Sequence, residues 1–273
     1  MVISNSDRFL FDLQGFLTLP GALSQAECDN YRALVRDLER HDYRDEWREH
    51  ASPGPTMGTK HEAMPRLQLN GLLRLHSDFD RLVDHPRVLP FLEDFMDRPQ
   101  LTNSWTICKG PGCEAGWWHH DIQPPQYWVR HGRIQSMMLN VIWCLDDNGP
   151  DDGCLLAIPG SHKRAFDLDA NSFPKEAVPG MQRITCRRGD AILLCEGVIH
   201  NGAGKSTPGT RTNVYFGYSS VHYNAMTHSP EQNRHYCMPQ EVLARLSPKQ
   251  REMCSWMEYA RPVGASEPRL VEV

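Results

Sequence analysis

The sequence lacks any paired-cysteine motif. Its nine cysteines are scattered along the chain without C-x-x-C spacing, and their number is odd. Paired spacings are typical of zinc sites and redox motifs, and even counts are typical of disulfide frameworks. The pattern therefore predicts reduced, mostly buried thiols.

The sequence also lacks an excess of basic charge. It has 29 Lys and Arg against 34 Asp and Glu, which gives a net charge of -5, and its pI is near 6.2. Nucleic acids and anionic lipid surfaces attract proteins with basic patches. We therefore expect no nucleic acid and no membrane among the partners.

Targeting and membrane-spanning segments are missing as well. No apolar run approaches the ~20 residues that a bilayer-spanning helix needs. Residues 1–8 lack the basic stretch and apolar core of a signal peptide, and residues 269–273 do not form a peroxisomal S-K-L signal. These absences predict a cytoplasmic protein.

The composition is that of a chain that can bury a core. Of the 273 residues, 40% are hydrophobic and 23% are charged. Barrels and sandwiches often reach ~200 to 250 residues as one unit, so we expect a single domain over residues 1–273. The sequence leaves monomer or homodimer open.

The most informative motif is His119-His120-Asp121. In an extended segment, side chains two residues apart point to the same face. His119 and Asp121 can therefore bind one metal ion, and His120 should point away from it. His200, far downstream, follows an apolar run that reads as a buried strand. Two imidazoles and one carboxylate on one face of an octahedron are typical of non-haem Fe(II) oxygenases.

Arg211 lies eleven residues after His200 and follows Gly and Pro residues that bend the chain back. The strand that begins at Arg211 should therefore start close to His200. A guanidinium presents a planar fork that matches a carboxylate. A surface ion pair remains the alternative role for this residue.

Longer strings identify a family resemblance. The segment at residues 152–162, with Gly153-Cys154-Leu155 and Pro159-Gly160-Ser161-His162, matches the G-C-L-x-x-x-P-G-S-H signature of the phytanoyl-CoA dioxygenase family. Residues 11–21 resemble the opening strand of that family. His119, Asp121, Gly189-Asp190, His200 and Arg211 occur in the order and spacing of the family.

The resemblance implies a fold, a cosubstrate and a reaction. It implies a mainly β protein with flanking α-helices, built as a double-stranded β-helix (a cupin-like jelly roll). It also implies Fe(II) held by His119, Asp121 and His200, with Arg211 binding the distal carboxylate of 2-oxoglutarate. The implied reaction uses O2 to oxidise a C–H bond of the substrate, and releases succinate and CO2.

Several other residues are candidates for the pocket. Asn140 interrupts an apolar strand and needs a polar partner, which is either a backbone group or the cosubstrate. Trp105 precedes the metal motif and could form a pocket wall. An aromatic and polar group around the motif suits a small organic substrate better than an acyl-CoA. Its members are Trp118, His120, Gln123 and Trp128.

A second class of function stays open at this point. A cupin-like protein could hold Zn(II) or Ni(II) with the same three ligands, as a hydrolase, an isomerase or a non-catalytic binder. Such a protein would have no need of 2-oxoglutarate. The role of Arg211 distinguishes the two hypotheses.

The periodicity divides the chain into three parts. Helices are expected over 24–41 and 86–96 in an N-terminal part (24–96), and one or two helices over 239–259, the second beginning at Ser247-Pro248. The polar segment 42–64 reads as a loop and a candidate lid. The jelly-roll core should lie within 100–222. Its expected strands are 101–109, 115–122, 134–146, 153–158, 182–188, 190–196, 198–202 and 211–222.

Overall fold

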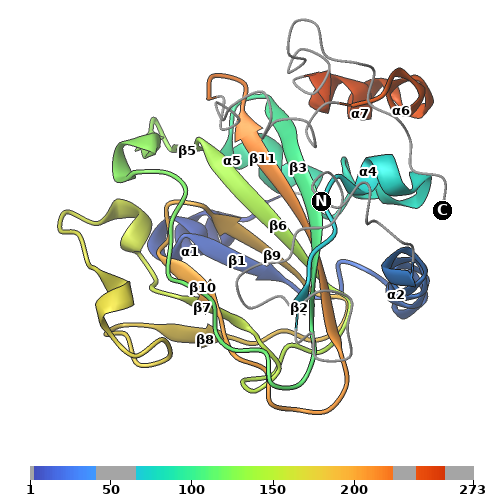
Figure 1. Cartoon of the computed structure of the whole chain (residues 1–273). Helices are drawn as coiled ribbons and strands as arrows, with labels where there is room; N and C mark the ends of the chain where they lie inside the picture. The colour runs from blue at the N-terminus through green and yellow to red at the C-terminus, as the bar shows by residue number, and fades with distance from the viewer. Residues whose placement is uncertain (1–2, 41–65, 224–237, 256–273) are drawn as a thin grey trace, which may run out of the picture.

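The computed structural model describes residues 3–40, 66–223 and 238–255 (Figure 1). Its main element is a six-stranded antiparallel sheet in the order β1-β9-β6-β11-β3-β2. The strands are β1 (Phe16–Leu19), β9 (Ala191–Cys195), β6 (Met138–Cys144), β11 (Arg211–Ser220), β3 (Pro99–Lys109) and β2 (Arg66–Leu67). Neighbouring strands in this sheet are distant in sequence, as in a jelly roll.

A second, smaller sheet packs next to the large one. It has the order β10-β7-β8, with β10 (His200–Gly202), β7 (Leu155–Ala157) and β8 (Gln182–Ile184). A separate hairpin joins β4 (Tyr127–Arg130) to β5 (Arg133–Ser136). Figure 1 shows the small sheet on the side of the large sheet that is away from most helices. The expected jelly roll with flanking helices is confirmed.

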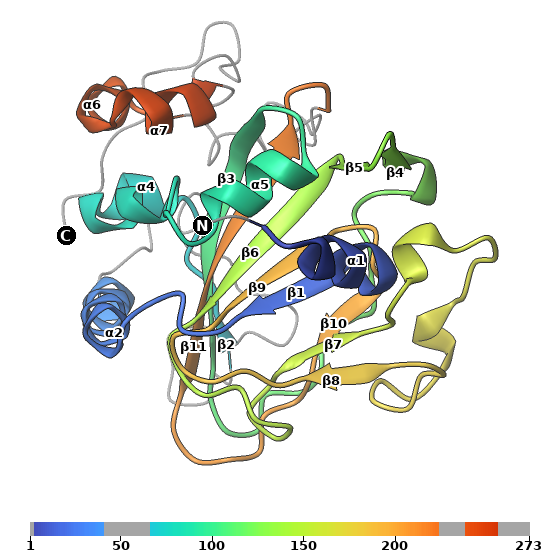
Figure 2. The same ribbon diagram turned by 180° about the vertical axis from the view of Figure 1, so that it is seen from behind.

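The helices cover the outer side of the large sheet, as the two opposite views show (Figures 1 and 2). None of the described helices is long and apolar enough to cross a membrane. The α-helices are α1 (Asn5–Gln14), α2 (Gln25–Arg40), α4 (Leu72–Leu75), α5 (Leu89–Phe95), α6 (Gln240–Arg245) and α7 (Pro248–Met253). The short 3-10 helices are η1 (Ser77–Leu82), η2 (Pro124–Gln126), η3 (Ser161–Lys163) and η4 (Ala170–Ser172).

Alternation along β11 shows how the large sheet separates the core from the site. Val214, Phe216 and Tyr218 are fully buried in the hydrophobic core. The intervening Asn213 and Tyr215 line a cavity on the other face. Because successive side chains of a strand point to opposite faces, one face packs the core and the other face is free for chemistry.

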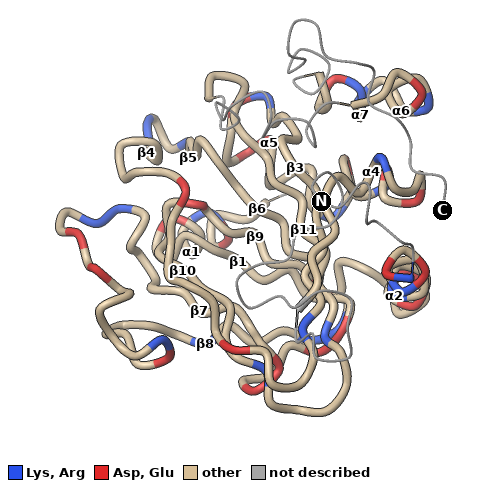
Figure 3. Tube along the Cα trace, in the orientation of Figure 1, with Lys and Arg blue, Asp and Glu red and all other residues tan. Residues whose placement is uncertain are grey.

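Charged residues are concentrated away from the centre of this sheet. Figure 3 shows Lys, Arg, Asp and Glu mainly on helices and loops, with the middle of the large strands mostly uncharged. The few charged side chains that do line the cavity therefore need a specific explanation, because burying a charge without a partner is costly.

The eight described cysteines are free and buried, which confirms the prediction of reduced thiols for them. Cys237 lies outside the described residues. The expected helix over 24–41 is α2, and the one over 86–96 is the shorter α5. Ser247 caps α7 and accepts a hydrogen bond from the backbone N–H of Gln250, as its Ser-Pro sequence predicts.

Two expected elements were wrong. The opening strand is only β1, because residues 5–14 form α1, whose N-cap Ser4 makes a capping box with Asp7. Residues 115–122 do not form a strand, and only His119 makes an isolated bridge there. The candidate lid over 42–64 lies outside the described residues.

Most of the remaining expected strands are shorter or divided. The expected strand 134–146 is broken at Met137 into β5 and β6, and the expected strand 182–188 ends at Ile184 in β8.

Candidate metal centre and active site

A cavity of ≈ 590 Å³ lies between the large sheet and the small one. Side chains from β3, β6, β9 and β11 form one wall, and residues around 116–121, 153–155 and 196–202 form the other. Pockets of this size hold small organic molecules. His119, Asp121, His200 and Arg211 all line it, so the structure brings the four principal sequence candidates together.

His119 and His200 face each other across a pair of backbone hydrogen bonds. The N–H of His119 donates to the carbonyl of His200 at 3.0 Å, and the N–H of His200 donates back at 2.9 Å. The two imidazole rings have centroids 4.2 Å apart. Residues that are 81 positions apart in the sequence are thereby fixed as neighbours.

Both imidazoles are oriented in the same way. Nδ1 of His119 donates to the carbonyl of Trp117 at 2.9 Å, and Nδ1 of His200 donates to the carbonyl of Val198 at 2.8 Å. Such a bond fixes the tautomer and leaves Nε2 as the nitrogen that can bind a metal. Burial and the neighbouring His119 lower the pKa of His200 to about 3, so this ring is neutral at physiological pH.

Asp121 is held beside these rings by the backbone. Its N–H donates to the carbonyl of Glu196 at 2.8 Å, so Asp121 and His119 are both attached to the segment that carries His200. The other edge of this segment is held by Asn171, whose side-chain amide accepts from the N–H of Trp118 and donates to its carbonyl. Asn171 thereby replaces the neighbouring strand that this segment lacks.

The donor set fits a divalent metal ion. Two imidazoles and a carboxylate on one side of a cavity are the ligands that Fe(II) takes in oxygenases. In the described ranges, no group of three or more His, Cys, Asp and Glu side chains is already closed into a metal-binding cluster. The structure places the side chains of His119, Asp121 and His200 on one cavity.

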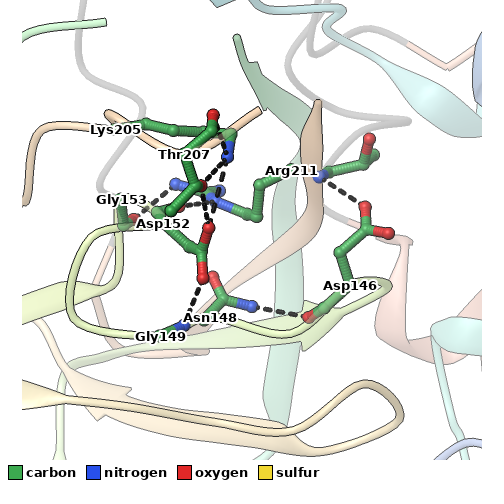
Figure 4. A network of polar contacts seen from close by, with 9 residues as sticks. Asp146, Asn148, Gly149, Asp152, Gly153, Lys205, Thr207 and Arg211 are labelled. Atoms are coloured by element: carbon green, nitrogen blue, oxygen red, sulfur yellow. Dashed lines mark hydrogen bonds and ion pairs between the residues drawn. The ribbon is translucent and has the colours of Figure 1, made fainter. Parts of the chain in front are cut away.

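Arg211 is buried at the cavity wall and is held by the backbone (Figure 4). Its guanidinium donates to the carbonyls of Asp152 at 3.2 Å, Gly153 at 2.5 Å and Ile107 at 3.4 Å. No carboxylate of the described residues forms an ion pair with it. The surface ion-pair alternative is therefore wrong, and the positive charge faces the cavity.

The loop that presents these carbonyls is itself braced. Asp152 accepts hydrogen bonds from the hydroxyl of Thr207, from Lys205 and from the N–H of Gly149 (Figure 4). The Thr207 hydroxyl is the main reason that the pKa of Asp152 is below its usual value. Gly153 has φ +76, and a Cβ there would meet Arg211 and Lys109. The glycine of the signature therefore makes room for both cations.

Lys109 is a cavity residue that the sequence did not indicate. It is opposite Arg211 in the pairing of β3 with β11, it is 4% exposed, and its Nζ donates to the carbonyl of Ala203 at 2.6 Å. Arg211 and Lys109 are the two Lys or Arg side chains among the described residues that line the cavity. Only the strand register, which the sequence does not give, reveals this pair.

The two expected wall residues lie on the cavity. Trp105 stacks on Tyr215 with ring centroids 5.1 Å apart, and Asn140 projects from the middle of β6. Both come from the cavity face of the large sheet. Glu196 also lines the cavity, and it was not among the sequence candidates.

The other four candidates do not line the cavity. Trp118 packs in a separate apolar cluster, and its Nε1 donates to the carbonyl of Lys175 at 2.8 Å. His120 and Gln123 both contact Arg164, and Trp128 is 42% exposed on β4. Trp118 and His120, on either side of His119, make their side-chain contacts with Lys175 and Arg164, which do not line the cavity. Their neighbour Trp117 does line the cavity.

Sequence comparison supports one family for this chain. A family model described as phytanoyl-CoA dioxygenase (PhyH) matches residues 11–213. The chain is 23% identical over 225 residues to a methylphosphonate hydroxylase of Gimesia maris, covering 80% of this chain and 82% of that protein. It is 24% identical over 240 residues to an ectoine dioxygenase of Nocardia farcinica, covering 77% and 76%.

Solved structures agree on the fold. HygX of Streptomyces hygroscopicus, with nickel and 2-oxoglutarate bound, has a TM-score of 0.69 at 21% identity, covering 82% of this chain and 90% of that one. The carbocyclase SnoK from nogalamycin biosynthesis has a TM-score of 0.60 at 19% identity, covering 80% and 85%. The cupin-like alternative without 2-oxoglutarate has no such support. The chain belongs to the phytanoyl-CoA dioxygenase family and is an Fe(II)- and 2-oxoglutarate-dependent oxygenase.

Proposed function

We propose that His119, Asp121 and His200 hold the iron, and that Arg211 binds the distal carboxylate of 2-oxoglutarate. The backbone pairing of His119 with His200 is the observation that carries this proposal, because it aligns two imidazoles whose Nδ1 atoms are already occupied. Each ring is left with one nitrogen for a metal in the same cavity.

The positive end of the cavity suits the cosubstrate. 2-Oxoglutarate carries two carboxylates, and Arg211 and Lys109 supply two buried cations on adjacent strands. The guanidinium is fixed by three carbonyls before any ligand arrives, so little side-chain entropy remains to be lost on binding. Asn140 and Trp105 lie on the same wall and confine the space around the cosubstrate.

Bound iron with 2-oxoglutarate supplies the oxidation of an unactivated C–H bond by O2, with release of succinate and CO2. The residues of this chain hold the ion, orient the cosubstrate and position the target carbon. The stacked pair Trp105 and Tyr215 lines the same cavity and gives it an aromatic wall.

We propose a small, polar organic molecule as the substrate, and hydroxylation as the outcome. Among the described residues, the side chains that line the cavity include only four charged ones: Lys109, Asp121, Glu196 and Arg211. Arg211 and Lys109 are assigned to the cosubstrate, so no other described Lys or Arg of the cavity remains for the phosphates of coenzyme A. Two relatives are named for methylphosphonate and ectoine, and a HygX structure contains hygromycin B, all of them free small molecules.

The test uses the visible charge-transfer band of an Fe(II)–keto acid chelate. Purified protein mixed anaerobically with Fe(II) and 2-oxoglutarate should develop this weak band. His119→Ala should abolish it because a ligand is lost. His120→Ala is the matched control and should keep the band, because its ring contacts Arg164 outside the cavity.

Two results would contradict the proposed ligands. One is a folded wild-type protein that gives no band. The other is a His119→Ala protein with an undiminished band, which would mean that the ion is bound elsewhere.

A further inference from the structure

The backbone beside His119 needs a second hydrogen-bonding partner. His119 exchanges two backbone hydrogen bonds with His200, at 3.0 and 2.9 Å. In an extended chain, the N–H and C=O groups of successive residues point to opposite edges, so those of Trp118 point away from His200. None of the described strands pairs with Trp118. Because this residue is 4% exposed, its two backbone groups need partners within the protein.

The connection between η3 and β8 supplies these partners (Figure 1). The side-chain amide of Asn171 accepts from the N–H of Trp118 at 3.0 Å and donates to its carbonyl at 2.9 Å. The indole Nε1 of Trp118 donates to the carbonyl of Lys175 at 2.8 Å. The N–H, the C=O and the indole nitrogen of Trp118 are therefore all bound by residues of this connection.

Asn171 is itself held in place. It lies in η4, where its backbone N–H donates to the side chain of the N-cap residue Asp169 at 3.2 Å. The preceding Ala170 is 4% exposed and packs in the same apolar cluster as Trp118 and Ile199. Because Trp118 and Ile199 are the chain neighbours of the two histidines of the site, this cluster ties Asn171 to both of them.

The hydrogen bond from Trp118 to Asn171 is connected to the imidazole of His119 through one peptide group. The N–H of Trp118 and the carbonyl of Trp117 belong to the same planar peptide. That carbonyl accepts from Nδ1 of His119 at 2.9 Å. Asn171 therefore fixes the peptide plane that orients the ring, and hydrogen bonds in such a chain strengthen one another.

We propose that Asn171 is a positioning residue for the metal ligand His119. Through the peptide that joins Trp117 to Trp118, it holds the imidazole with Nδ1 occupied and leaves Nε2 for the ion. This inference rests on the proposed function of the site. Asn171 is not among the residues that line the cavity, so it acts on the ion through this hydrogen-bonded chain.

The experiment titrates the metal-free full-length protein with Co(II), whose visible spectrum reports its coordination. Asn171→Leu keeps the approximate shape of the side chain and removes both hydrogen bonds. It should weaken Co(II) binding by at least about tenfold and change the spectrum of the bound ion, as loss of such outer partners does. Asn171→Asp keeps an acceptor for the N–H of Trp118 but loses the donor, so its affinity should lie between those of Asn171→Leu and the wild type.

The matched control is Ser172→Ala. The hydroxyl of Ser172 donates to the carbonyl of Asp169 at 2.7 Å, which is a bond within the same connection. Ser172→Ala should bind Co(II) with the affinity and the spectrum of the wild type. The Co(II)-saturated Asn171→Leu protein should bind 2-oxoglutarate as the wild type does, because Arg211 lies on the large sheet.

The failures are distinguishable. Wild-type affinity and spectrum in a folded Asn171→Leu protein would overturn this inference and leave the three-ligand site intact. An equal loss in Ser172→Ala, or weaker 2-oxoglutarate binding by Asn171→Leu, would overturn it too, because the connection would then be a general support of the fold. If Asn171→Leu does not fold, weakened Co(II) binding by Asn171→Asp supports the inference and wild-type binding overturns it. Absence of Co(II) binding by the wild type would overturn the proposed function itself.

Discussion

Replacement of Arg211 by Met tests the cosubstrate site most directly. Met keeps much of the side-chain length but removes the charge and the fork. If Arg211 forms two charge-assisted hydrogen bonds with the distal carboxylate, each contributes about 1.5 to 3 kcal/mol. With Lys109 still in place, we expect a loss of about 3 to 4 kcal/mol, which is a ~10²- to 10³-fold weaker affinity for 2-oxoglutarate.

The assay is an anaerobic calorimetric titration of the Co(II)-loaded proteins with two ligands. 2-Oxopentanoate has the same keto acid end as 2-oxoglutarate but a methyl group in place of the distal carboxylate. Arg211→Met should leave its affinity nearly unchanged. The difference between the two ligands gives the coupling energy of the guanidinium with the carboxylate alone.

Folding has to be controlled, because Arg211 also has a structural role. Its removal leaves the carbonyls of Asp152 and Gly153 without a donor, at about 1 to 3 kcal/mol for each unsatisfied group. Arg211→Lys keeps the charge and should lose less affinity than Arg211→Met. A coupling energy below about 0.5 kcal/mol in a folded Arg211→Met protein would refute the assignment, since this is the range of sites that do not interact.

Three other substitutions give separate tests. Lys109→Met should weaken 2-oxoglutarate binding by about tenfold in the same titration, less than Arg211→Met, because an ammonium lacks the bidentate fork. His162, fully buried with both ring nitrogens unpartnered, has its pKa lowered to about 4 by burial. In the unfolded chain, this imidazole takes up a proton near pH 6.5. The free energy of unfolding of the wild type should therefore fall by up to about 3 kcal/mol between pH 6.5 and pH 4. That of His162→Asn should fall less, and urea unfolding at both pH values measures the difference. Ser247→Ala removes the cap of α7 and should lower the unfolding free energy by about 1 kcal/mol in the same assay, whereas an unchanged value would show that α7 does not depend on the cap.

The sequence singled out the proposed metal ligands because their signal is local. The spacing of His119 and Asp121 defines a shared face, and the G-C-L and P-G-S-H strings select the family that places His200 beside them. The substrate contacts were predicted from closeness to this motif alone. Trp118 and His120 met that criterion, but neither of them lines the cavity.

Other features depend on information that a single sequence does not display. Lys109 becomes a partner of Arg211 only through the register of β3 and β11. Glu196 is notable only because it is buried in the cavity, which needs coordinates. The helix α1 is different, because Ser4 and Asp7 already form a capping-box pattern in the sequence, and this signal was overlooked in favour of a strand.

The link between Asn171 and Trp118 has a consequence for how relatives of this chain can diverge. The connection from residue 164 to 181 carries exposed aromatic side chains such as Phe166, yet one amide in it fixes the backbone beside His119. Substitutions elsewhere in this connection can alter what the enzyme accepts and leave the iron chemistry untouched. Changes at Asn171 would disturb both together, so we expect natural variation to spare this position.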